Sequence, residues 1–262
     1  MGVTISIVNQ KGGVGKTTTA IEIAAILADE GKRVLAIDLD QQSNFTTGVG
    51  GDTEKPTIFD LFKSEEPDLE ATIQTISENF DLIPGDPAMS KSDFAFMNPP
   101  DVYLLKELVE ALDDEYDYFI IDNGPARNTL LNMNYLAADY IVMCIDASVD
   151  SVSGVDAIVA DMMTYHKAKT VLSHAKILGV VMTKYKKTAI SSAIMEIMRD
   201  KIDNEIPDVV KIKDAFLLSV RNATVVDETK LYSKPLQEYK RWSNPAIDYR
   251  SVVREIISKI EG

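Results

Sequence analysis

Residues 11–18 read Lys-Gly-Gly-Val-Gly-Lys-Thr-Thr, a run whose residue types and spacing suit a phosphate-binding loop. Its second and third glycines let backbone N–H groups approach phosphate oxygens, where a Cβ would obstruct or strain the loop. Lys16 is expected to reach the β- and γ-phosphates of a nucleotide, Thr17 to ligate Mg²⁺ through its hydroxyl, and Thr18 to bond the α-phosphate. The expected nucleotide-binding residues of the loop are Lys11, Gly12, Gly13, Val14, Gly15, Lys16, Thr17 and Thr18.

Gln10 and Lys11 set this loop apart from the standard pattern Gly-x4-Gly-Lys-Thr. Gln10 holds the place of the first glycine, and Lys11 adds a second positive charge. A second lysine beside a triphosphate has a use if it reaches across to a nucleotide held by another subunit. The alternative is a glycine turn with solvated lysines. The context argues against that alternative, because the apolar run 3–8 predicts a strand before the loop and the stretch 20–28 predicts a helix after it.

Two acids, Asp38 and Asp40, follow a second predicted strand over Lys32–Asp38. Alternation along an extended chain puts both carboxylates on the same side, and the carboxyl end of a parallel strand faces the phosphate loop. Asp38 is suited to hold Mg²⁺ through water, and Asp40 is suited to orient or polarise an attacking water. The alternative for the pair is a solvated turn with two acids.

A third acid, Asp122, ends the apolar run Tyr118–Ile121. Apolar residues followed by an aspartate form the Walker B pattern. Asp122 is expected to accept a bond from a Mg²⁺-bound water or from Thr17. The alternative is an aspartate that caps the turn after the strand.

The elements that must position these residues alternate between strands and helices. Further strands are predicted over 80–85, 140–145 and 176–183, with short ones near 209 and 216; helices are predicted over 57–62, 102–112, 151–165, 189–203 and 245–260. Residues 44–79 are otherwise less regular. This alternation predicts an α/β fold, a single doubly wound and mostly parallel sheet with helices on both faces. The expected organisation is a single domain over 1–262, without a separate N-terminal DNA-binding domain.

Composition narrows the classes of protein. The chain has 262 residues, is 45% hydrophobic and carries a net charge of −14. No run approaches the length of a membrane span, and the early strand leaves no room for a signal peptide. The single cysteine, Cys144, lies in an apolar run and is expected to be buried, and neither His166 nor His174 has partners at zinc-ligand spacing. These features favour a cytoplasmic protein.

A net acidic charge does not exclude a local basic face. No Asp or Glu occurs from Met162 to Met195, a stretch that carries Lys167, Lys169, Lys176, Lys184, Lys186 and Lys187. A second basic group comprises Arg221, Lys230, Lys234, Lys240 and Arg241, with Tyr239 and Trp242 nearby. Either group could be a solvated surface. An acid-free stretch in an acidic protein favours a surface that binds DNA without sequence specificity, through phosphate contacts.

Together, the loop at 11–18, Asp38 with Asp40, and Asp122 resemble the deviant Walker A ATPases of the ParA/MinD family, most of all the ParA (Soj-type) DNA-partition branch. The resemblance implies a nucleotide-sandwich homodimer in which Lys11 acts across the interface, with Lys11, Lys16 and Asp40 as catalytic residues. It also implies ATP and Mg²⁺ as cofactors. The family's other functional positions fall on Thr183 and Lys184 for the adenine, and on Lys187 and Arg221 for DNA.

Two segments depart from the family pattern. Gln41-Gln42-Ser43 stands where the family has Pro-Gln-Gly, and Asn123-Gly124-Pro125 stands where it has Thr-Pro-Pro. The resemblance implies a partition ATPase that binds DNA non-specifically and is released by slow hydrolysis, which a ParB-like partner stimulates, in plasmid or chromosome segregation. Its location would be cytoplasmic and nucleoid-associated, without stable membrane association.

Two alternatives remain open from the residues. One is a MinD-like, membrane-associated positioning ATPase, which would need a basic amphipathic C-terminal helix. The last predicted helix carries few cations, so a helix packed into the core is the better interpretation. The other is a nucleotide-switch scaffold that does not hydrolyse ATP, against which the presence of Asp40 and both loop lysines counts.

Overall fold

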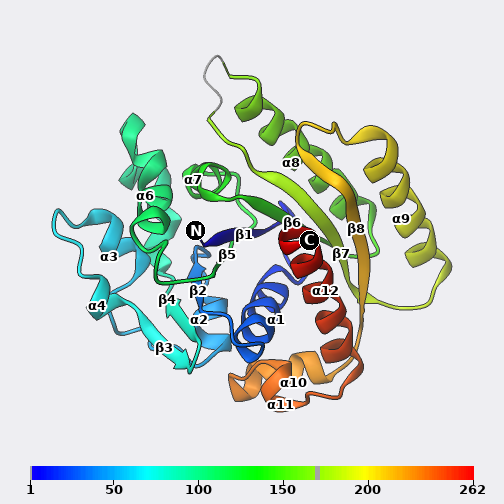
Figure 1. Cartoon of the computed structure of the whole chain (residues 1–262), viewed down its shortest axis with the longest axis horizontal. Helices are drawn as coiled ribbons and strands as arrows, with labels where there is room; N and C mark the ends of the chain where they lie inside the picture. Colours follow the sequence, from blue (N-terminus) through cyan, green and yellow to red (C-terminus); the bar gives the residue numbers. More distant parts are fainter. Residues whose placement is uncertain (1, 169–171) are drawn as a thin grey trace.

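The computed structural model describes residues 2–168 and 172–262. Within them eight strands form one sheet in the order β3-β4-β2-β5-β1-β6-β7-β8, in which β3 is antiparallel to β4 and every other neighbouring pair is parallel (Figure 1). This topology confirms the predicted doubly wound sheet. The strands are β1 (Val3–Val8), β2 (Val34–Asp38), β3 (Gln74–Ser77), β4 (Phe80–Ile83), β5 (Tyr118–Asp122), β6 (Tyr140–Ile145), β7 (Lys176–Tyr185) and β8 (Lys211–Arg221).

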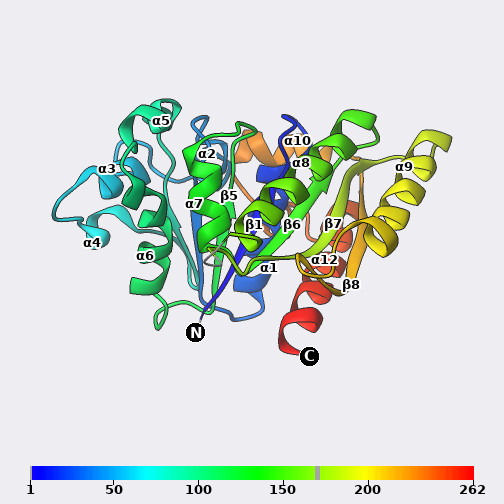
Figure 2. The ribbon, with the colours of Figure 1, turned by 90° about the horizontal axis from the view of Figure 1, so that it is seen from above.

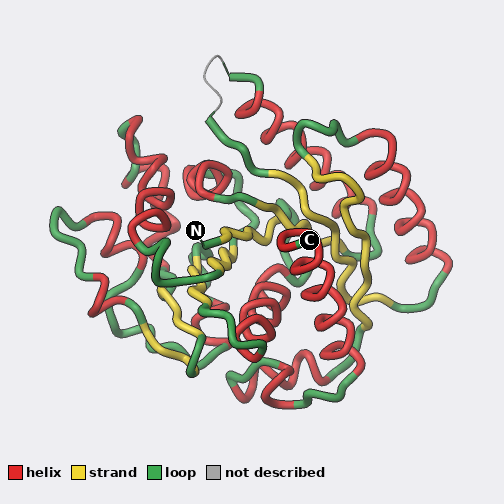
Figure 3. The backbone as a smooth tube through the Cα atoms, in the orientation of Figure 1, coloured by secondary structure: helices red, strands yellow, loops and turns green. Residues whose placement is uncertain are grey.

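Helices cover both faces of the sheet (Figures 1 and 3). The α-helices are α1 (Lys16–Asp29), α2 (Asn44–Gly48), α3 (Ile58–Lys63), α4 (Leu69–Thr72), α5 (Ser92–Ala95), α6 (Leu104–Ala111), α7 (Thr129–Ala137), α8 (Val149–His166), α9 (Ala189–Asp200), α10 (Val225–Tyr232), α11 (Leu236–Tyr239) and α12 (Asn244–Glu261). Two 3₁₀ turns, η1 (Pro87–Lys91) and η2 (Pro99–Tyr103), and a π turn, η3 (Lys201–Glu205), complete the set in the described residues.

Alternating side chains of the central strands build separate hydrophobic layers on the two faces. In β6, Val142 and Cys144 belong to the layer that includes α1 and α12, whereas Ile141, Met143 and Ile145 belong to the layer beneath α8 and α9. A third layer lies beneath α3, α6 and α7. The strands are therefore buried on both faces, which explains their nearly continuous apolar sequences.

The carboxyl ends of the parallel strands lie on one side of the molecule, opposite the side where both chain termini lie (Figure 2). The loops that follow β1, β2, β5 and β6 therefore gather at the carboxyl ends of the strands, which is where open α/β sheets bind ligands. This arrangement brings the phosphate loop and the three candidate acids together.

Most predicted elements are confirmed, several of them with shifted bounds. The strand expected near 216 is β8, whereas Val209 lies in a turn before it; within β8 the pairing with β7 shifts register between Lys211 and Phe216, where Asp214 has φ 55°. The helix expected over 189–203 ends at Asp200 and continues as the π turn. The edge strand β3 had no apolar run to reveal it, because alternate side chains along it face solvent.

The last helix, α12, packs into the core as expected. Its Tyr249, Val252, Val253 and Ile256 are buried in the layer that includes α1. No helix among residues 2–168 and 172–262 is both long and apolar enough to cross a membrane.

Candidate nucleotide-binding site

The phosphate loop joins β1 to α1 in the expected order of strand, loop and helix. Gly13 has φ 76° and Gly15 has φ 81°, left-handed values that favour glycine. A Cβ at Gly15 would also lie 3.1 Å from the side chain of Thr183. Gly15 caps α1 without a side-chain hydrogen bond, so the first N–H groups of the helix and its dipole are directed at the loop.

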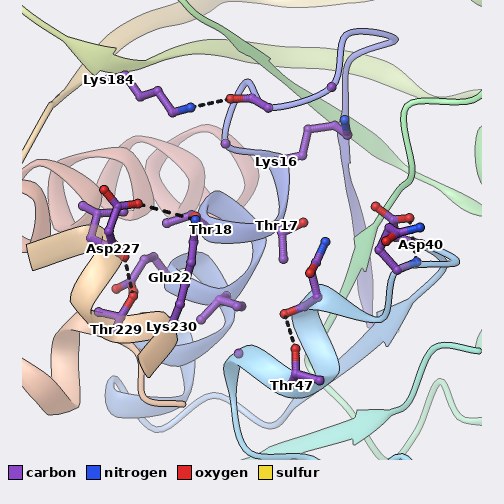
Figure 4. Close-up of a pocket in the computed structure, with 18 of the residues that line it drawn as sticks. Lys16, Thr17, Thr18, Glu22, Asp40, Thr47, Lys184, Asp227, Thr229 and Lys230 are labelled. Carbon is purple, nitrogen blue, oxygen red and sulfur yellow. Dashed lines mark hydrogen bonds and ion pairs between the residues drawn. The ribbon is translucent and has the colours of Figure 1, made fainter. Parts of the chain in front are cut away.

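A cavity of about 460 Å³ lies beside this loop (Figure 4). Its volume is within the range of small-molecule sites, roughly 300 to 1,000 Å³. Its lining joins the phosphate loop to α1, α2, the loop after β2 and α10. The lining residues are Gly12, Gly13, Gly15, Lys16, Thr17, Thr18, Ile21, Glu22, Asp40, Gln42, Asn44, Thr47, Gly48, Pro125, Lys184, Val226, Asp227, Thr229, Lys230 and Lys234.

Lys16 lies almost fully buried at the top of this cavity, and its Nζ donates to the carbonyl oxygen of Lys11 at 3.2 Å. Burial lowers the pKa of Lys16, while the carboxylates of Asp122 and Asp40 oppose that shift. A phosphate group at the loop would give the ammonium a charged acceptor in place of a carbonyl.

Lys11 is held within its own chain. Its Nζ lies 3.0 and 3.1 Å from the carboxylate oxygens of Asp146 and donates to Ser148 Oγ at 2.7 Å. Ser148 is also the N-cap of α8. The side chain therefore points along the loop after β6, and its action across a dimer interface stays a prediction.

The two strand-end acids Asp38 and Asp122 are neighbours in register but differ in their contacts. Asp38 Oδ2 accepts from the N–H and hydroxyl of Thr46, at 3.0 and 2.8 Å, and its Oδ1 accepts from Asp40 N–H at 3.1 Å. Burial raises the pKa of Asp38 to about 6. Asp38 thus holds α2 and the start of the next loop, a role that its sequence position alone did not reveal.

Asp122 is fully buried, and neither carboxylate oxygen has a hydrogen-bond partner in the structure. Burial raises the pKa of Asp122 well above its usual range and the charge of Asp38 raises it further, while the nearby Thr17 hydroxyl and the charge of Lys16 oppose the shift. A buried carboxyl with vacant acceptors is costly unless another group completes it. Asp122 thus has the freer oxygens of the two acids, and bonds of Asp38 or Asp122 to a metal-bound water stay predictions.

Asp40 lies at the other side of the cavity, where the two departures from the family pattern meet. Its Oδ1 accepts from Gln42 N–H at 3.0 Å, and a Cβ at Gly124 would lie 3.3 Å from the same oxygen. Ser43, at the place of the family's glycine, has φ 49° and thus a left-handed backbone. A non-glycine residue in this conformation carries backbone strain.

Thr183 and Lys184 contact the phosphate loop itself. Thr183 Oγ1 donates to Val14 carbonyl oxygen at 2.7 Å, and Lys184 Nζ donates to Gly13 carbonyl oxygen at 2.6 Å (Figure 4). A smaller cavity of about 50 Å³ adjoins them, lined by Gly15, Thr18, Thr183, Lys184, Val220, Arg221, Asn222, Ala223, Val226, Asp227 and Tyr249. Its position supports the expected base-binding end of the site, while direct base contacts by Thr183 and Lys184 stay a prediction.

Asn9 is a site residue that the sequence reasoning missed. Its Nδ2 donates to the carbonyl oxygens of Cys144 and Ser151, at 2.7 and 3.1 Å, and its Oδ1 accepts from Lys11 N–H at 2.8 Å. It therefore ties the start of the phosphate loop to β6 and α8. A Cβ at Gly154 would lie 2.4 Å from Asn9 Oδ1, so α8 needs a glycine there. The available signal was an amide directly after an apolar strand.

Glu22 and the α10 residues of the cavity were also missed. Glu22 is fully buried in α1, its Oε1 accepts from Leu236 N–H at 2.7 Å, and its Oε2 has no partner in the structure. Burial raises the pKa of Glu22 to about 8. An acid flanked by two isoleucines at 21 and 23 was the signal for this buried carboxyl.

The acid-free stretch does not form one basic face. Lys176 begins β7 and Lys167 follows the end of α8, where His166 Nε2 lies 2.9 Å from the carbonyl oxygen of Ala175, whereas Lys186 and Lys187 follow the end of β7. At about 3.3 Å per residue, a ten-residue strand separates these groups by roughly 30 Å. The lysines of that stretch therefore lie in two groups, and a DNA surface made from either group stays a prediction; Lys169 lies outside the described residues.

The two residues expected to contact DNA follow neighbouring strand ends. Lys187 is exposed just after β7, and Arg221 ends β8. Asn222 N–H donates to Tyr185 carbonyl oxygen at 2.9 Å, which joins the two strand ends. The guanidinium of Arg221 is bound by Asp248 through contacts of 2.7 and 2.8 Å. Arg221 is thus paired, and half of its side chain still faces solvent.

Comparisons with known proteins show which family the chain resembles. Residues 2–176 match a family described as an AAA domain. The chain is 30% identical to the chromosome partitioning protein ParA of Caulobacter vibrioides, over 97% of this chain and 94% of that protein. It is 29% identical to the chromosome-partitioning ATPase Soj of Thermus thermophilus, over 98% and 96% of the two chains.

A solved structure shares the fold over the whole length. The putative plasmid partition protein of Borrelia burgdorferi, bound to AMPPNP, has a TM-score of 0.79 and 23% identity and covers 99% of this chain and all of its own. The extent of the sequence matches and the deviant phosphate loop lead to one assignment. The chain belongs to the ParA/MinD family of P-loop ATPases, in its ParA (Soj-type) branch.

Proposed function

We propose that this protein is an ATP-dependent partition ATPase, which dimerises around ATP and Mg²⁺, binds DNA non-specifically and leaves it after hydrolysis. The observation that carries the proposal is the convergence of Lys16, Thr17 and Asp40 on one cavity of about 460 Å³. A glycine-rich loop, a buried lysine and a strand-end acid are the parts needed for phosphoryl transfer to water. The cargo class is plasmid or chromosome, as the relatives' names suggest.

The residues of the site fit ATP. The free N–H groups of α1 and the ammonium of Lys16 suit the phosphates, with Gly12, Gly13, Val14 and Gly15 around them. The smaller cavity beside Thr183 and Lys184 suits the base. The Borrelia burgdorferi relative binds an ATP analogue, as its description states, which supports the same ligand class here.

The residues also fit Mg²⁺. No group of three or more His, Cys, Asp or Glu side chains able to hold a metal occurs in the described part of the chain. Magnesium often keeps several waters and takes only one or two protein ligands beside phosphates. The Thr17 hydroxyl would ligate it, and the vacant oxygens of Asp122 would accept from its water. Bound there, Mg²⁺ would neutralise charge on the phosphate oxygens.

Hydrolysis would be slow and would depend on groups from two subunits. Asp40 would orient the attacking water. Lys11 of one subunit would stabilise developing charge on the nucleotide of the other, which requires a two-fold dimer. A ParB-like partner would stimulate the reaction, and non-specific DNA contacts near Lys187 and Arg221 would place the dimer on the nucleoid in the cytoplasm.

The two alternatives have less support. A MinD-like membrane role would need a free amphipathic C-terminal helix, and α12 buries its apolar side against α1 and the sheet. A scaffold that does not hydrolyse ATP would not need Asp40 at the cavity beside the loop.

One experiment separates these functions. Binding of the protein to random duplex DNA and to anionic liposomes is measured with ATP and Mg²⁺, with ADP, and without nucleotide. We expect ATP-dependent binding to DNA and none to liposomes. ATP-dependent binding to liposomes alone would reject the partition function and favour the MinD-like one, and ATP-dependent dimers without turnover would favour the scaffold.

A further inference from the structure

A carboxylate on α8, Asp161, contacts two loops of the nucleotide site at once. Its Oδ2 accepts from Gln10 Nε2 at 3.2 Å. Its Oδ1 accepts from Nη2 of Arg127 in a close ion pair. Gln10 opens the phosphate loop, and Arg127 lies in the loop between β5 and α7. Asp161 thus connects the two segments from outside the cavity.

The loop that carries Arg127 also carries the backbone that surrounds Asp40. A Cβ at Gly124 would lie 3.3 Å from Asp40 Oδ1, and Pro125 lines the nucleotide cavity. The loop is anchored at its start by Asn123, whose Nδ2 donates to Ser6 Oγ at 3.0 Å. Between that anchor and α7, the ion pair of Arg127 ties the loop to α8.

The loop is also anchored at its end, because Asn128 caps α7 by accepting from Leu131 N–H at 3.2 Å. Asn123 and Asn128 fix the ends of the loop but leave the segment between them to other contacts. The guanidinium of Arg127 makes such a contact, two residues from Pro125.

Burial makes this contact more than a surface ion pair. The side chain of Asp161 is only 8% exposed, whereas that of Arg127 is 68% exposed. Burial raises the pKa of Asp161, and the charge and hydrogen bond of Arg127 oppose that shift. Without Arg127, the carboxylate would keep one amide donor in a mostly desolvated place, so it would take up a proton or turn toward water. Either change would release the loop from α8.

We propose that Asp161 is a positioning residue for ATP hydrolysis, which sets the loop beside Asp40 by joining Arg127 to Gln10. The proposal rests on the proposed role of Asp40 in orienting water. Asp161 touches neither the cavity nor the expected nucleotide, so it acts through the two loops. Displacement of a positioned group by about 1 Å can cost on the order of 100-fold in rate. For an indirect support we expect a loss of about tenfold in kcat.

The test compares Arg127→Ala, Asp161→Asn and Arg127→Lys with the wild type in ATP turnover and ATP affinity. We expect the first two to lower kcat about tenfold while KM and the Kd for ATP change less than twofold. Arg127→Lys should retain part of the kcat that Arg127→Ala loses, because lysine keeps the positive charge but lacks the planar guanidinium with its forked donors. The double variant should be no worse than either single one, as for residues that act together.

Asp156→Asn is the matched control, since Asp156 also lies on α8 but pairs with Lys201 and with neither loop residue. It should leave kcat unchanged. An equal loss in the control, or a loss of ATP affinity that matches the loss of kcat, would overturn the proposal in favour of general stabilisation of α8.

A second readout does not depend on hydrolysis. Amide hydrogen exchange over residues 123–128 should be faster in Asp161→Asn than in the wild type, with or without ADP. If the wild type shows no ATP turnover at all, the proposed function fails while faster exchange still supports the bridge. Unchanged exchange in both Asp161→Asn and Arg127→Ala would overturn the bridge even if the ATPase is confirmed.

Discussion

The ammonium of Lys11 lies 3.0 Å from the carboxylate of Asp146 in the same chain. Both side chains are about one quarter exposed, so water reaches the pair. Lys11 is the residue proposed to serve the nucleotide of a second subunit, and in that role it must leave Asp146 and Ser148. In that role the contact would compete with dimer formation, and the free energy needed to break a partly exposed pair is small, roughly 1 kcal/mol.

Lys11→Ala is the first variant to examine. We expect it to bind ATP like the wild type but to lose ATP-dependent dimerisation, hydrolysis and DNA binding, because Lys16 serves the nucleotide within its own subunit. Calorimetry and size-exclusion chromatography measure the first two properties.

Mixing Lys11→Ala with Lys16→Ala tests whether Lys11 acts across the interface. In that heterodimer the Lys11→Ala subunit holds ATP and receives an intact Lys11 from its partner, so some turnover should return at one site. If heterodimers form without any turnover, and Lys11→Ala alone still dimerises with ATP, Lys11 is a solvated loop lysine.

Asp146→Asn tests whether the contact within the chain restrains the dimer. Without the carboxylate, Lys11 keeps only Ser148 as a partner, so dimerisation should require several-fold less ATP; about 1 kcal/mol corresponds to a factor of roughly five. Analytical ultracentrifugation across an ATP titration gives the midpoint. Asp150→Asn, in the first turn of α8, is the control and should leave the midpoint of the ATP titration unchanged. A midpoint that stays in place for Asp146→Asn would show that the pair imposes no restraint.

Asp40→Ala separates binding from hydrolysis. Asp40 lies at the cavity and is not needed to hold the phosphate loop, so the variant should bind ATP and accumulate as a dimer with little turnover. General-base and water-orienting groups typically contribute about 10² to 10⁴ in rate. Asp38→Ala is an informative comparison, because it removes three hydrogen bonds and should lower the melting temperature. Normal turnover in Asp40→Ala would exclude Asp40 as the water-orienting acid.

Periodicity and local chemistry were enough to predict most of the sheet. β5 and β6 match their predicted bounds, because buried parallel strands have continuous apolar sequences between clear stops. The edge strand β3 and the helices α2, α4, α5, α7, α10 and α11 went unpredicted, since they are short, partly exposed or poorly patterned. Their positions depend on tertiary contacts that no window of sequence contains.

The site shows the same limit. The loop at 11–18 and Asp40 were predicted by spacing, because strand, loop and helix fix their relative places. From spacing alone, Asp38 and Asp122 were expected to have similar roles. The structure distinguishes them, because Thr46 donates two hydrogen bonds to Asp38 and none to Asp122. Asn9 contacts Cys144, and Asp161 contacts Gln10, each more than 100 residues away along the chain, while Arg127 lies 34 residues from Asp161; the sequence offers no local sign of these contacts.

Glu22 predicts a pH dependence of stability. Its pKa in the folded protein is about 8, raised by burial from the usual 4.5, so the folded state holds the proton over a range where the unfolded state has lost it. The contribution of Glu22 to the free energy of unfolding is then greatest below about pH 4.5 and falls as the pH rises toward 8. At roughly 1.4 kcal/mol per pKa unit, the loss is at most about 5 kcal/mol.

Glu22→Gln should remove this dependence, because the amide oxygen can still accept from Leu236 N–H without ionising. Urea unfolding at pH 5 and pH 8 should show a smaller difference between the two conditions in the variant than in the wild type. Glu196→Gln, an exposed glutamate on α9, is the control and should behave like the wild type. An equal pH dependence in Glu22→Gln and the wild type would contradict the raised pKa.

The DNA surface is tested at the ends of β7 and β8. Lys187 is exposed and can reach a phosphate, so Lys187→Glu should weaken binding to random DNA without changing the affinity for ATP. Arg221 is bound by Asp248, and Arg221→Gln removes its charge without placing two carboxylates together. Removal of one cation that binds a phosphate should reduce the slope of log K against log salt concentration by about one.

Lys176→Glu, at the opposite end of β7, is the control and should leave that slope unchanged. If Lys187→Glu and Arg221→Gln both keep the full slope, DNA binds elsewhere. The next side chains to test by charge reversal are then the exposed lysines in and beside α10 and α11, Lys230, Lys234 and Lys240.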